Sequence, residues 1–261
     1  MSARGFLTRL RDASRPPAPP APEPLLDVEG VCAVCDQDTR FKAWDPWLRD
    51  SFICIKCHSA PRERAFYTVL ERVRPDWREL SVHECSPSNP TGKLAREARL
   101  YTMTHFDPAL APGAEGPGWR NENLEAQTFA DESFDLVVTQ DVFEHIFEPG
   151  LAIAEIARTL KPGGMHVGTA PLANKGRPSE RRARRLPDGS VEHLAEPLHH
   201  QNPIDAEGSL VTIDWGYDIA DYFDAHAPLS TTIHALDDLN RGIRGEFLEV
   251  LVSRKAGPPA L

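Results

Sequence analysis

The chain lacks any long apolar stretch. No run approaches the roughly 18 consecutive apolar residues of a membrane-spanning helix. The N-terminal segment MSARGFLTRLRDASR has no apolar core of the kind that a signal peptide requires. Basic residues are also in deficit, with 29 Lys and Arg against 39 Asp and Glu, for a net charge of −10. These absences argue against membrane spanning and secretion, predict a cytoplasmic protein, and disfavour a surface built to bind nucleic acid.

Proline, in contrast, is abundant near the N-terminus. The chain holds 24 prolines, and the segment PPAPPAPEP between Pro16 and Pro24 concentrates them. A polyproline segment is stiff and cannot join a sheet. We therefore expect residues 1–30 to form a disordered tail with a Pro-rich linker. The remaining length suits one sizeable domain with a small appendage.

Cysteine is scarce, yet four of the five cysteines form two CxxC pairs. A pair of CxxC turns supplies four thiolates for a tetrahedral zinc ion. Disulfides are disfavoured in a cytosolic chain, and a redox CxxC does not come in matched pairs. Residues 31–60 are therefore predicted to be a structural zinc ribbon whose ligands are Cys32, Cys35, Cys54 and Cys57. The fifth, Cys85, stands alone at a strand end and is expected to serve packing.

The rest of the chain alternates between strand and helix patterns. Strands are predicted at Leu80–Glu84, Leu100–Thr104, Phe134–Thr139, Met165–Thr169, Thr231–Ala235 and Glu246–Val252. Helices are predicted over residues 61–78 (as the link to the ribbon), Thr91–Arg99, Leu151–Leu160 and Tyr217–Asp224. This alternation predicts an α/β fold with a parallel sheet covered on both faces. We expect the proline spacer and the linking helix to keep the cores of the ribbon and the sheet apart.

One contiguous segment carries a family resemblance. Residues 129–171 read FADESFDLVVTQDVFEHIFEPGLAIAEIARTLKPGGMHVGTAP, a strand, an acidic loop ending in Glu-His, a helix and an LKPGG turn. This combination resembles a class I S-adenosylmethionine-dependent methyltransferase of the type 11-like group. The resemblance implies a Rossmann-like, doubly wound, mostly parallel seven-stranded sheet in the methyltransferase order over residues 79–255. With its terminal CHSAPRER segment, the ribbon resembles the front end of a bacterial subgroup, some of whose members belong to sugar and polysaccharide biosynthesis.

Several polar residues follow the predicted strands. In an open parallel sheet, ligands bind beyond the carboxyl ends of the central strands. Glu84, Asp107, Gln140 and Asp141 are placed there by the strand pattern. Asp107 comes 23 residues after Glu84, a spacing suited to a carboxylate that binds ribose hydroxyls, with His105 as its substitute.

The resemblance adds further cofactor contacts and one departure. It implies that Asn123, Leu124 and Glu125 lie beside the adenine, and that residues 141–145 pass the sulfonium and the acceptor. The family's first loop is rich in glycine, whereas residues 84–92 read ECSPSNPTG. Because prolines fix φ and remove N–H donors, we expect this loop to take a different path, with the Ser86 side chain offering a hydrogen bond to the cofactor.

The segment 172–212 reads as an insertion over the acceptor site. It holds turn-forming residues and polar groups suited to hydroxylated ligands. His199 is predicted to face the acceptor as a general base, with His145 as the other catalytic candidate. An alternative is that both histidines are structural or solvated. The arginine run between Arg177 and Arg185 could hold a phosphate, although an exposed charged segment is the commoner explanation.

These expectations converge on a methyltransferase with two bound groups. S-adenosylmethionine would be the methyl donor, and Zn²⁺ the structural metal of the ribbon. The expected acceptor is an oxygen of a small molecule or of a glycan or polysaccharide-related compound. The alternatives are a zinc-ribbon RNA-base methyltransferase, against which the negative charge weighs, and a non-catalytic module that only binds partners.

Overall fold

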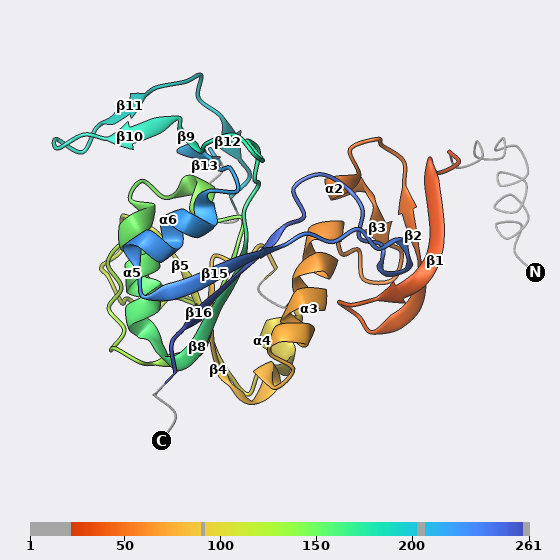
Figure 1. Cartoon of the computed structure of the whole chain (residues 1–261), viewed down its shortest axis with the longest axis horizontal. Coiled ribbons are helices and arrows are strands. Elements are labelled where there is room, and N and C mark those ends of the chain that lie inside the picture. The colour runs from red at the N-terminus through yellow and green to blue at the C-terminus, as the bar shows by residue number, and fades with distance from the viewer. Residues whose placement is uncertain (1–21, 90–91, 203–206, 258–261) are drawn as a thin grey trace, which may run out of the picture.

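A seven-stranded sheet forms the centre of the molecule (Figure 1). The computed structural model describes residues 22–89, 92–202 and 207–257, so most of the predicted tail lies outside the described residues. In spatial order the strands are β15 (Leu229–His234), β16 (Val250–Lys255), β8 (Leu160–Thr169), β7 (Phe134–Gln140), β4 (Ser81–Cys85), β5 (Leu100–His105) and β6 (Arg120–Asn121).

The sheet is doubly wound and mostly parallel. β4 pairs in parallel with β5 and β7, β5 with β6, and β7 with β8. β16 runs antiparallel to both of its neighbours. The chain moves outward from β4 through β5 and β6, then returns to the other side of β4 at β7, so the strand order reverses between β4 and β7. The predicted fold class is confirmed, and this reversal is where such sheets bind ligands.

Helices cover both faces of the sheet, as the alternation predicted. α3 (Pro61–Val73) and α4 (Lys93–Glu97) pack on one face, while α5 (Pro149–Thr159) and α6 (Ile219–His226) pack on the other (Figure 1). Short 3₁₀ turns lie at η1 (Trp77–Glu79), η2 (Phe143–His145) and η3 (Leu239–Arg241). The apolar side of α3 shares one core with β4, β7, β8 and β16. The helix expected to be a link is therefore also part of the cover of the sheet.

The LKPGG turn differs from its prediction. α5 ends at Thr159, and β8 begins at the next residue. The turn thus belongs to the start of β8, where pairing with β7 is irregular between Phe134 and Leu136. Gly163 has a φ of 78°, a conformation that glycine adopts without steric cost.

The predicted insertion forms short antiparallel strand pairs joined by turns. β10 (Ala183–Arg185) and β11 (Val191–His193) make a hairpin that projects from the domain (Figure 1). β12 (His199–His200) pairs with β13 (Ser209–Leu210), and β9 (Glu180–Arg181) pairs with β14 (Ile213–Asp214). Residues 203–206, between β12 and β13, lie outside the described residues.

The cysteine-bearing segment is a small sheet of its own. β1 (Leu26–Cys32) and β2 (Gln37–Ala43) form a hairpin, to which the two-residue strand β3 (Ile53–Cys54) is added after α2 (Leu48–Ser51). Its core is small and consists mainly of Phe41, Phe52 and cysteine side chains. A core of this size gives little stability by itself, which fits a segment that depends on a metal.

The ribbon and the sheet domain are not separate bodies, contrary to our expectation. The fully buried Arg64 of α3 donates to the carbonyls of Ser59 and Phe52 in the ribbon and to that of Gly242 near the end of the chain. Buried Lys93 of α4 donates to the Ala33 carbonyl of the ribbon, 3.1 Å away. The sequence pattern identified two cores, but it contained no sign of the buried cations that join them.

Candidate functional site

A large cavity opens at the carboxyl ends of the parallel strands. Its volume is about 1310 Å³, and Glu84, His105, Gln140 and Asp141 line it at the ends of β4, β5 and β7. Ligand pockets in proteins usually measure about 300–1,000 Å³, so this cavity has room for more than one small molecule. It lies at the strand reversal between β4 and β7, where the topology predicts a ligand.

Glu84 is a buried carboxyl group in the floor of this cavity. It is 5% exposed, and its carboxylate accepts hydrogen bonds from the Tyr101 hydroxyl at 2.6 Å and from the Gln140 amide at 3.2 Å. Burial raises the pKa of Glu84 to about 7, although both hydrogen bonds act in the opposite direction. Near neutral pH this residue therefore exchanges between its charged and neutral forms.

The first loop turns at a serine. Ser86 lines the cavity and has a φ of 49°, in the left-handed region that usually favours glycine. Its backbone N–H donates to the Thr104 carbonyl at 2.7 Å, which holds the turn against β5. The backbone at this position thus adopts a glycine-like conformation with a serine side chain. Residues 90 and 91 of this loop lie outside the described residues.

Of the two ribose candidates, the structure brings His105 and not Asp107 to the cavity. The Asp107 carboxylate accepts from the Ala109 N–H at 2.9 Å in a local turn, and Asp107 does not line the cavity. His105 is buried, lines the cavity and lies edge-to-face with Trp119. β5 ends at His105, and Asp107 lies two residues beyond the strand, outside the cavity lining.

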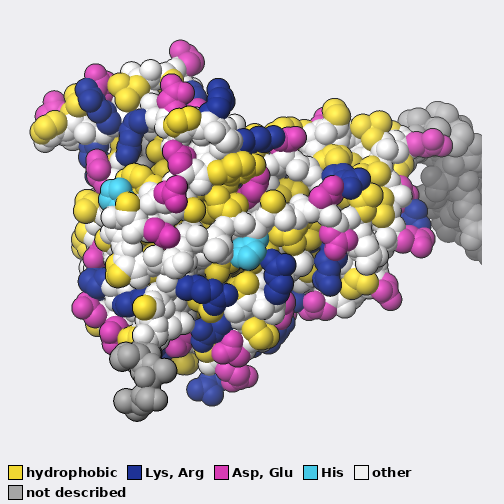
Figure 2. Space-filling model, viewed as in Figure 1, with side chains coloured by type: hydrophobic (Ala, Val, Ile, Leu, Met, Phe, Trp, Pro, Cys, Tyr) yellow, Lys and Arg dark blue, Asp and Glu magenta, His cyan; other side chains and the backbone are white. Residues whose placement is uncertain are grey.

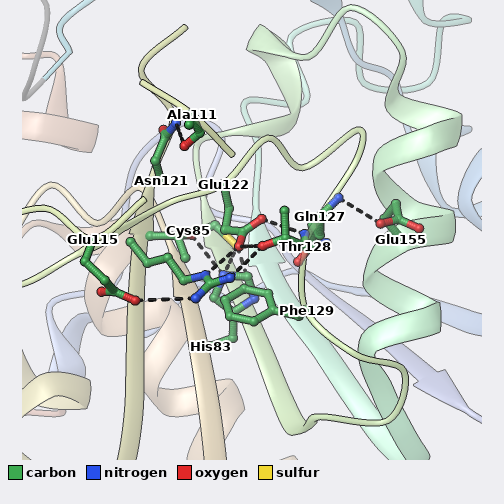
Figure 3. A network of polar contacts seen from close by, with 12 residues as sticks. His83, Cys85, Ala111, Glu115, Asn121, Glu122, Gln127, Thr128, Phe129 and Glu155 are labelled. Carbon is green, nitrogen blue, oxygen red and sulfur yellow. Dashed lines mark hydrogen bonds and ion pairs between the residues drawn. The ribbon is translucent and has the colours of Figure 1, made fainter. Parts of the chain in front are cut away.

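The segment after β5 is anchored by two buried polar residues, Asn121 and Glu122 (Figure 3). The Asn121 side-chain amide donates to three carbonyls of residues 107–111, and its oxygen accepts from the Asp107 N–H. Glu122 accepts from the Arg120 guanidinium at 2.7 Å and from the Thr128 N–H at 2.8 Å. These bonds fix the backbone on both sides of the next residue, Asn123.

The three predicted adenine contacts, Asn123, Leu124 and Glu125, take different environments in the structure. Asn123 lines the cavity, and its side-chain oxygen accepts from the Glu125 N–H at 3.0 Å. Leu124 is 6% exposed and packs in the core against α5 and β7. Asn123 is therefore available to a ligand, whereas Leu124 is a core residue. Glu125, the third residue that the resemblance placed beside the adenine, also lines the cavity.

Asp141 is held by the ribbon. It has a φ of 52° at the end of β7, and its carboxylate accepts from Arg49 of α2 at 2.7 Å. The Arg62 guanidinium at the start of α3 lies 3.3 Å from the same oxygen. Neither arginine was predicted, because no sequence motif connects positions so far apart. The ribbon thus forms one wall of the cavity.

Three residues of the acceptor side converge on one point. Glu144 is 1% exposed, and neither of its carboxylate oxygens has a hydrogen-bond partner. His145 Nε2 lies 3.8 Å and His200 Nδ1 lies 3.7 Å from the same oxygen, Glu144 Oε1. His145 Nδ1 is 2.9 Å from the Leu210 carbonyl. A carbonyl only accepts, so this Nδ1 carries the proton and Nε2 is free to accept.

His199 is exposed and does not line the cavity. Successive residues of a strand point to opposite faces, so β12 directs His200 inward and His199 outward. Leu198, His200, Ser209 and Leu210 of the insertion line the cavity. The insertion does line the cavity, as predicted. The histidine that faces inward is His200, whereas the predicted residue was its neighbour His199.

The arginine run of the insertion is committed to partners within the chain. Arg182 pairs with Asp214 at 2.8 Å, and Arg185 pairs with Glu125 at 3.0 Å. Arg181 donates to the Phe147 carbonyl. These contacts hold the hairpin to the domain. On the face shown in Figure 2, basic and acidic side chains are interspersed.

The four ribbon cysteines come together as predicted. All four Sγ atoms lie within 4.8 Å of one another, and Cys32 Sγ is 3.7 Å from Cys57 Sγ. Sulfurs bound tetrahedrally at about 2.3 Å from zinc lie about 3.8 Å apart. The thiol set and its spacing therefore fit a closed Zn²⁺ site. Cys85 is 2% exposed and lies away from this cluster, beside His83.

The comparisons with known proteins agree with this topology. A family model described as a methyltransferase domain matches residues 85–168, from the end of β4 almost to the end of β8. The resemblance that the sequence predicted is thereby confirmed for this segment, which holds the first loop, Asn123, Asp141 and the Glu-His pair.

Two curated relatives match parts of the chain. Dimethylglycine N-methyltransferase of Parasynechococcus marenigrum is 43% identical over 54 residues, which is 21% of this chain and 19% of that protein. Ubiquinone biosynthesis O-methyltransferase of Sinorhizobium fredii is 32% identical over 102 residues, covering 36% of this chain and 41% of that protein. The chain thus spans less than half the length of either relative.

Among solved structures, an S-adenosylmethionine-dependent methyltransferase from Mesorhizobium loti resembles the chain with a TM-score of 0.46. It is 13% identical, and the match covers 73% of this chain and 98% of that one. Values this low transfer neither a function nor a substrate. Among the described residues, none of the helices has the length and apolar character to cross a membrane.

Proposed function

We propose that the chain is an S-adenosylmethionine-dependent methyltransferase acting on an oxygen of a small-molecule or glycan acceptor. The cavity of about 1310 Å³ carries this proposal, because the insertion and the strand ends of the sheet face each other across it, beside the wall that the ribbon forms. The strand ends of the methyltransferase domain form one side, and the insertion forms the other. A binding-only module would need neither so large a cavity nor a second wall.

The strand-end wall fits the donor chemically. The sulfonium donor is a cation with ribose hydroxyls and an adenine, and the wall offers carboxylates, neutral amides and an imidazole to it. Glu84, His105 and Asn123 are the residues that would hold it, with Ser86 and Gln140 beside them. Burial lowers the pKa of His105, which favours the neutral imidazole at pH 7. A neutral imidazole can accept a hydrogen bond from a hydroxyl or donate one to it. When bound, the donor supplies an electrophilic methyl group.

The insertion wall fits the acceptor. Methyl transfer is an in-line displacement, so the chain contributes mainly by aligning the two reactants and by excluding water. The Thr212 N–H donates to the Glu144 carbonyl at 2.7 Å, which attaches the insertion to the loop after β7. The proton of an acceptor hydroxyl would leave toward the group formed by Glu144, His145 and His200. His200 replaces His199 as the catalytic candidate in this proposal.

The ribbon would hold one structural Zn²⁺ on its four thiolates. Four protein ligands close the coordination shell, so the ion would have no position for a substrate. Its role would be to fold the segment that presents Arg49 to Asp141. The ribbon would therefore support the wall of the cavity.

Calorimetry with S-adenosylmethionine and S-adenosylhomocysteine tests the proposal. We expect both to bind the wild-type chain. His105→Ala should weaken binding by about 0.5–1.5 kcal/mol, the usual contribution of a neutral hydrogen bond. Asp107→Ala is the matched control and should bind as the wild type does, because its carboxylate is used within its own turn. If neither compound binds the wild-type chain, the proposal is overturned.

A further inference from the structure

The group formed by Glu144, His145 and His200 has an unexplained feature. Glu144 is buried to 99% of its surface, yet both carboxylate oxygens lack a hydrogen-bond partner. The nearest polar atoms are the two imidazole nitrogens at 3.7 and 3.8 Å, which is too long for a hydrogen bond. A buried carboxylate without a partner is costly, so native proteins rarely retain one without a compensating group.

The arrangement of these three side chains is that of metal ligands. Their three donor atoms lie within 4.8 Å of one another, and both nitrogens face the same carboxylate oxygen. Ligands about 2.1 Å from a common ion lie up to about 4.2 Å apart, so the two nitrogen–oxygen distances already fit. Two imidazoles and one carboxylate form the ligand set of catalytic zinc sites and of mononuclear iron sites, which keep open positions for a substrate.

His145 is oriented as a metal ligand requires. Its Nδ1–H points at the Leu210 carbonyl, 2.9 Å away, and this leaves the Nε2 lone pair directed toward Glu144. Ligating histidines generally donate their other ring N–H to a carbonyl or carboxylate, which fixes the tautomer and the ring. Leu210 lies on β13, the partner strand of His200 on β12, so one hairpin orients one ligand and supplies another.

From this geometry we propose that Glu144, His145 and His200 bind a divalent first-row transition metal in the wall of the cavity. The site is separate from the four cysteines, and among the described residues it offers three protein ligands, so an acceptor could complete it. An acceptor bearing a hydroxyl would coordinate through oxygen, which holds that oxygen beside the donor and favours transfer of its proton to Oε2, the second oxygen of the Glu144 carboxylate. The role toward the acceptor depends on the proposed methyltransferase function, but the binding of the metal does not.

Cobalt binding to the full-length chain tests this site. Protein stripped of metal is titrated with Co²⁺ alone, because cobalt on cysteine gives thiolate charge-transfer absorption that cobalt on imidazole and carboxylate does not give. We expect two Co²⁺ per wild-type chain, of which only one shows thiolate absorption. His200→Ala should reduce the stoichiometry from two to one and leave the thiolate absorption unchanged.

His199→Ala is the matched control. It alters the adjacent histidine on the same strand, which is exposed and outside the cavity, and it should retain two Co²⁺. A single Co²⁺ in the wild type, or two in His200→Ala, would overturn the proposal. If His200→Ala does not fold, anomalous scattering from cobalt-loaded wild-type crystals decides, through a peak or its absence between the three side chains. The readout does not involve the methyl donor, so it remains informative even if S-adenosylmethionine fails to bind.

Discussion

Replacing the buried carboxyl of Glu84 by an amide, as Glu84→Gln, should stabilise the chain at high pH. Burial raises the pKa of Glu84 from 4.5 to about 7, which means that the folded protein holds this proton more tightly than the unfolded chain does. The ionised carboxylate therefore opposes folding. This destabilisation is absent below pH 4.5, grows between pH 4.5 and 7, and is complete above pH 7.

The magnitude follows from the two pKa values. Each pH unit between 4.5 and about 7 corresponds to about 1.4 kcal/mol, so full ionisation costs about 3 kcal/mol. Glu84 is 5% exposed, and for this reason solvent screens little of that cost. Glutamine has the shape of the protonated carboxyl and keeps an oxygen for Tyr101 or Gln140.

Urea unfolding of the wild type and Glu84→Gln at pH 5 and pH 8 measures the effect. We expect the amide variant to be more stable by less than about 1 kcal/mol at pH 5 and by about 3 kcal/mol at pH 8. Comparing the two proteins at each pH cancels the titration of all other groups. The buried Trp77 and Trp215 provide a fluorescence signal for the transition.

Glu155→Gln is the matched control. Its hydrogen bonds with Arg158 lower the pKa of Glu155, so its contribution to stability is lost only as the pH falls below about 4.5. Between pH 5 and pH 8 the difference between this variant and the wild type should be constant. If Glu84→Gln also shows the same difference at both pH values, Glu84 ionises at its ordinary pKa and the reasoning is refuted.

The remaining predictions concern the ribbon and its junction with the sheet domain. Cys54→Ser should release the zinc proposed for the ribbon and lower the free energy of unfolding of the whole chain. Metal analysis and urea unfolding measure the two effects. A sheet domain of unchanged stability would contradict the observed junction. Arg64→Ala should cost at least about 2 kcal/mol, because it leaves the buried Phe52 and Gly242 carbonyls without their donor, whereas the Ser59 carbonyl keeps its bond from the Cys54 N–H; a loss below about 1 kcal/mol would contradict this. Gly30→Ala should lower the free energy of unfolding by about 1–3 kcal/mol, because the added Cβ would lie 1.9 Å from the Asn240 carbonyl oxygen. Gly176→Ala is the control and should leave the stability unchanged, because no atom lies within 4 Å of the added Cβ.

Local patterns in the sequence were sufficient to predict much of the fold. The apolar run at Phe134–Thr139 is typical of a buried central strand, and a four-thiolate metal site requires the two CxxC pairs to meet. Both features depend on residues close together in the chain. The strand order followed from the family resemblance, and the family match over residues 85–168 agrees with it.

The candidate site was predicted less well, because side-chain direction at a strand end depends on where the strand stops. Asp107 and His199 each lie within two residues of the side chain that lines the cavity, His105 in one case and His200 in the other. In β12 a shift of one residue turns a side chain to the opposite face, whereas β5 has already ended before the chain reaches Asp107. Composition and spacing do not specify such a shift.

The contacts between distant segments were decided by the tertiary structure alone. Arg49 reaches Asp141 across 92 positions, and Arg64 reaches Gly242 across 178. The sequence by itself determined a zinc-ribbon pattern, an α/β sheet and a ligand crevice, because these arise from local periodicity and from the rules of parallel sheets. Only the folded chain determined that the ribbon is a wall of the cavity and that Glu144 faces two histidines, because such meetings depend on how separate elements pack.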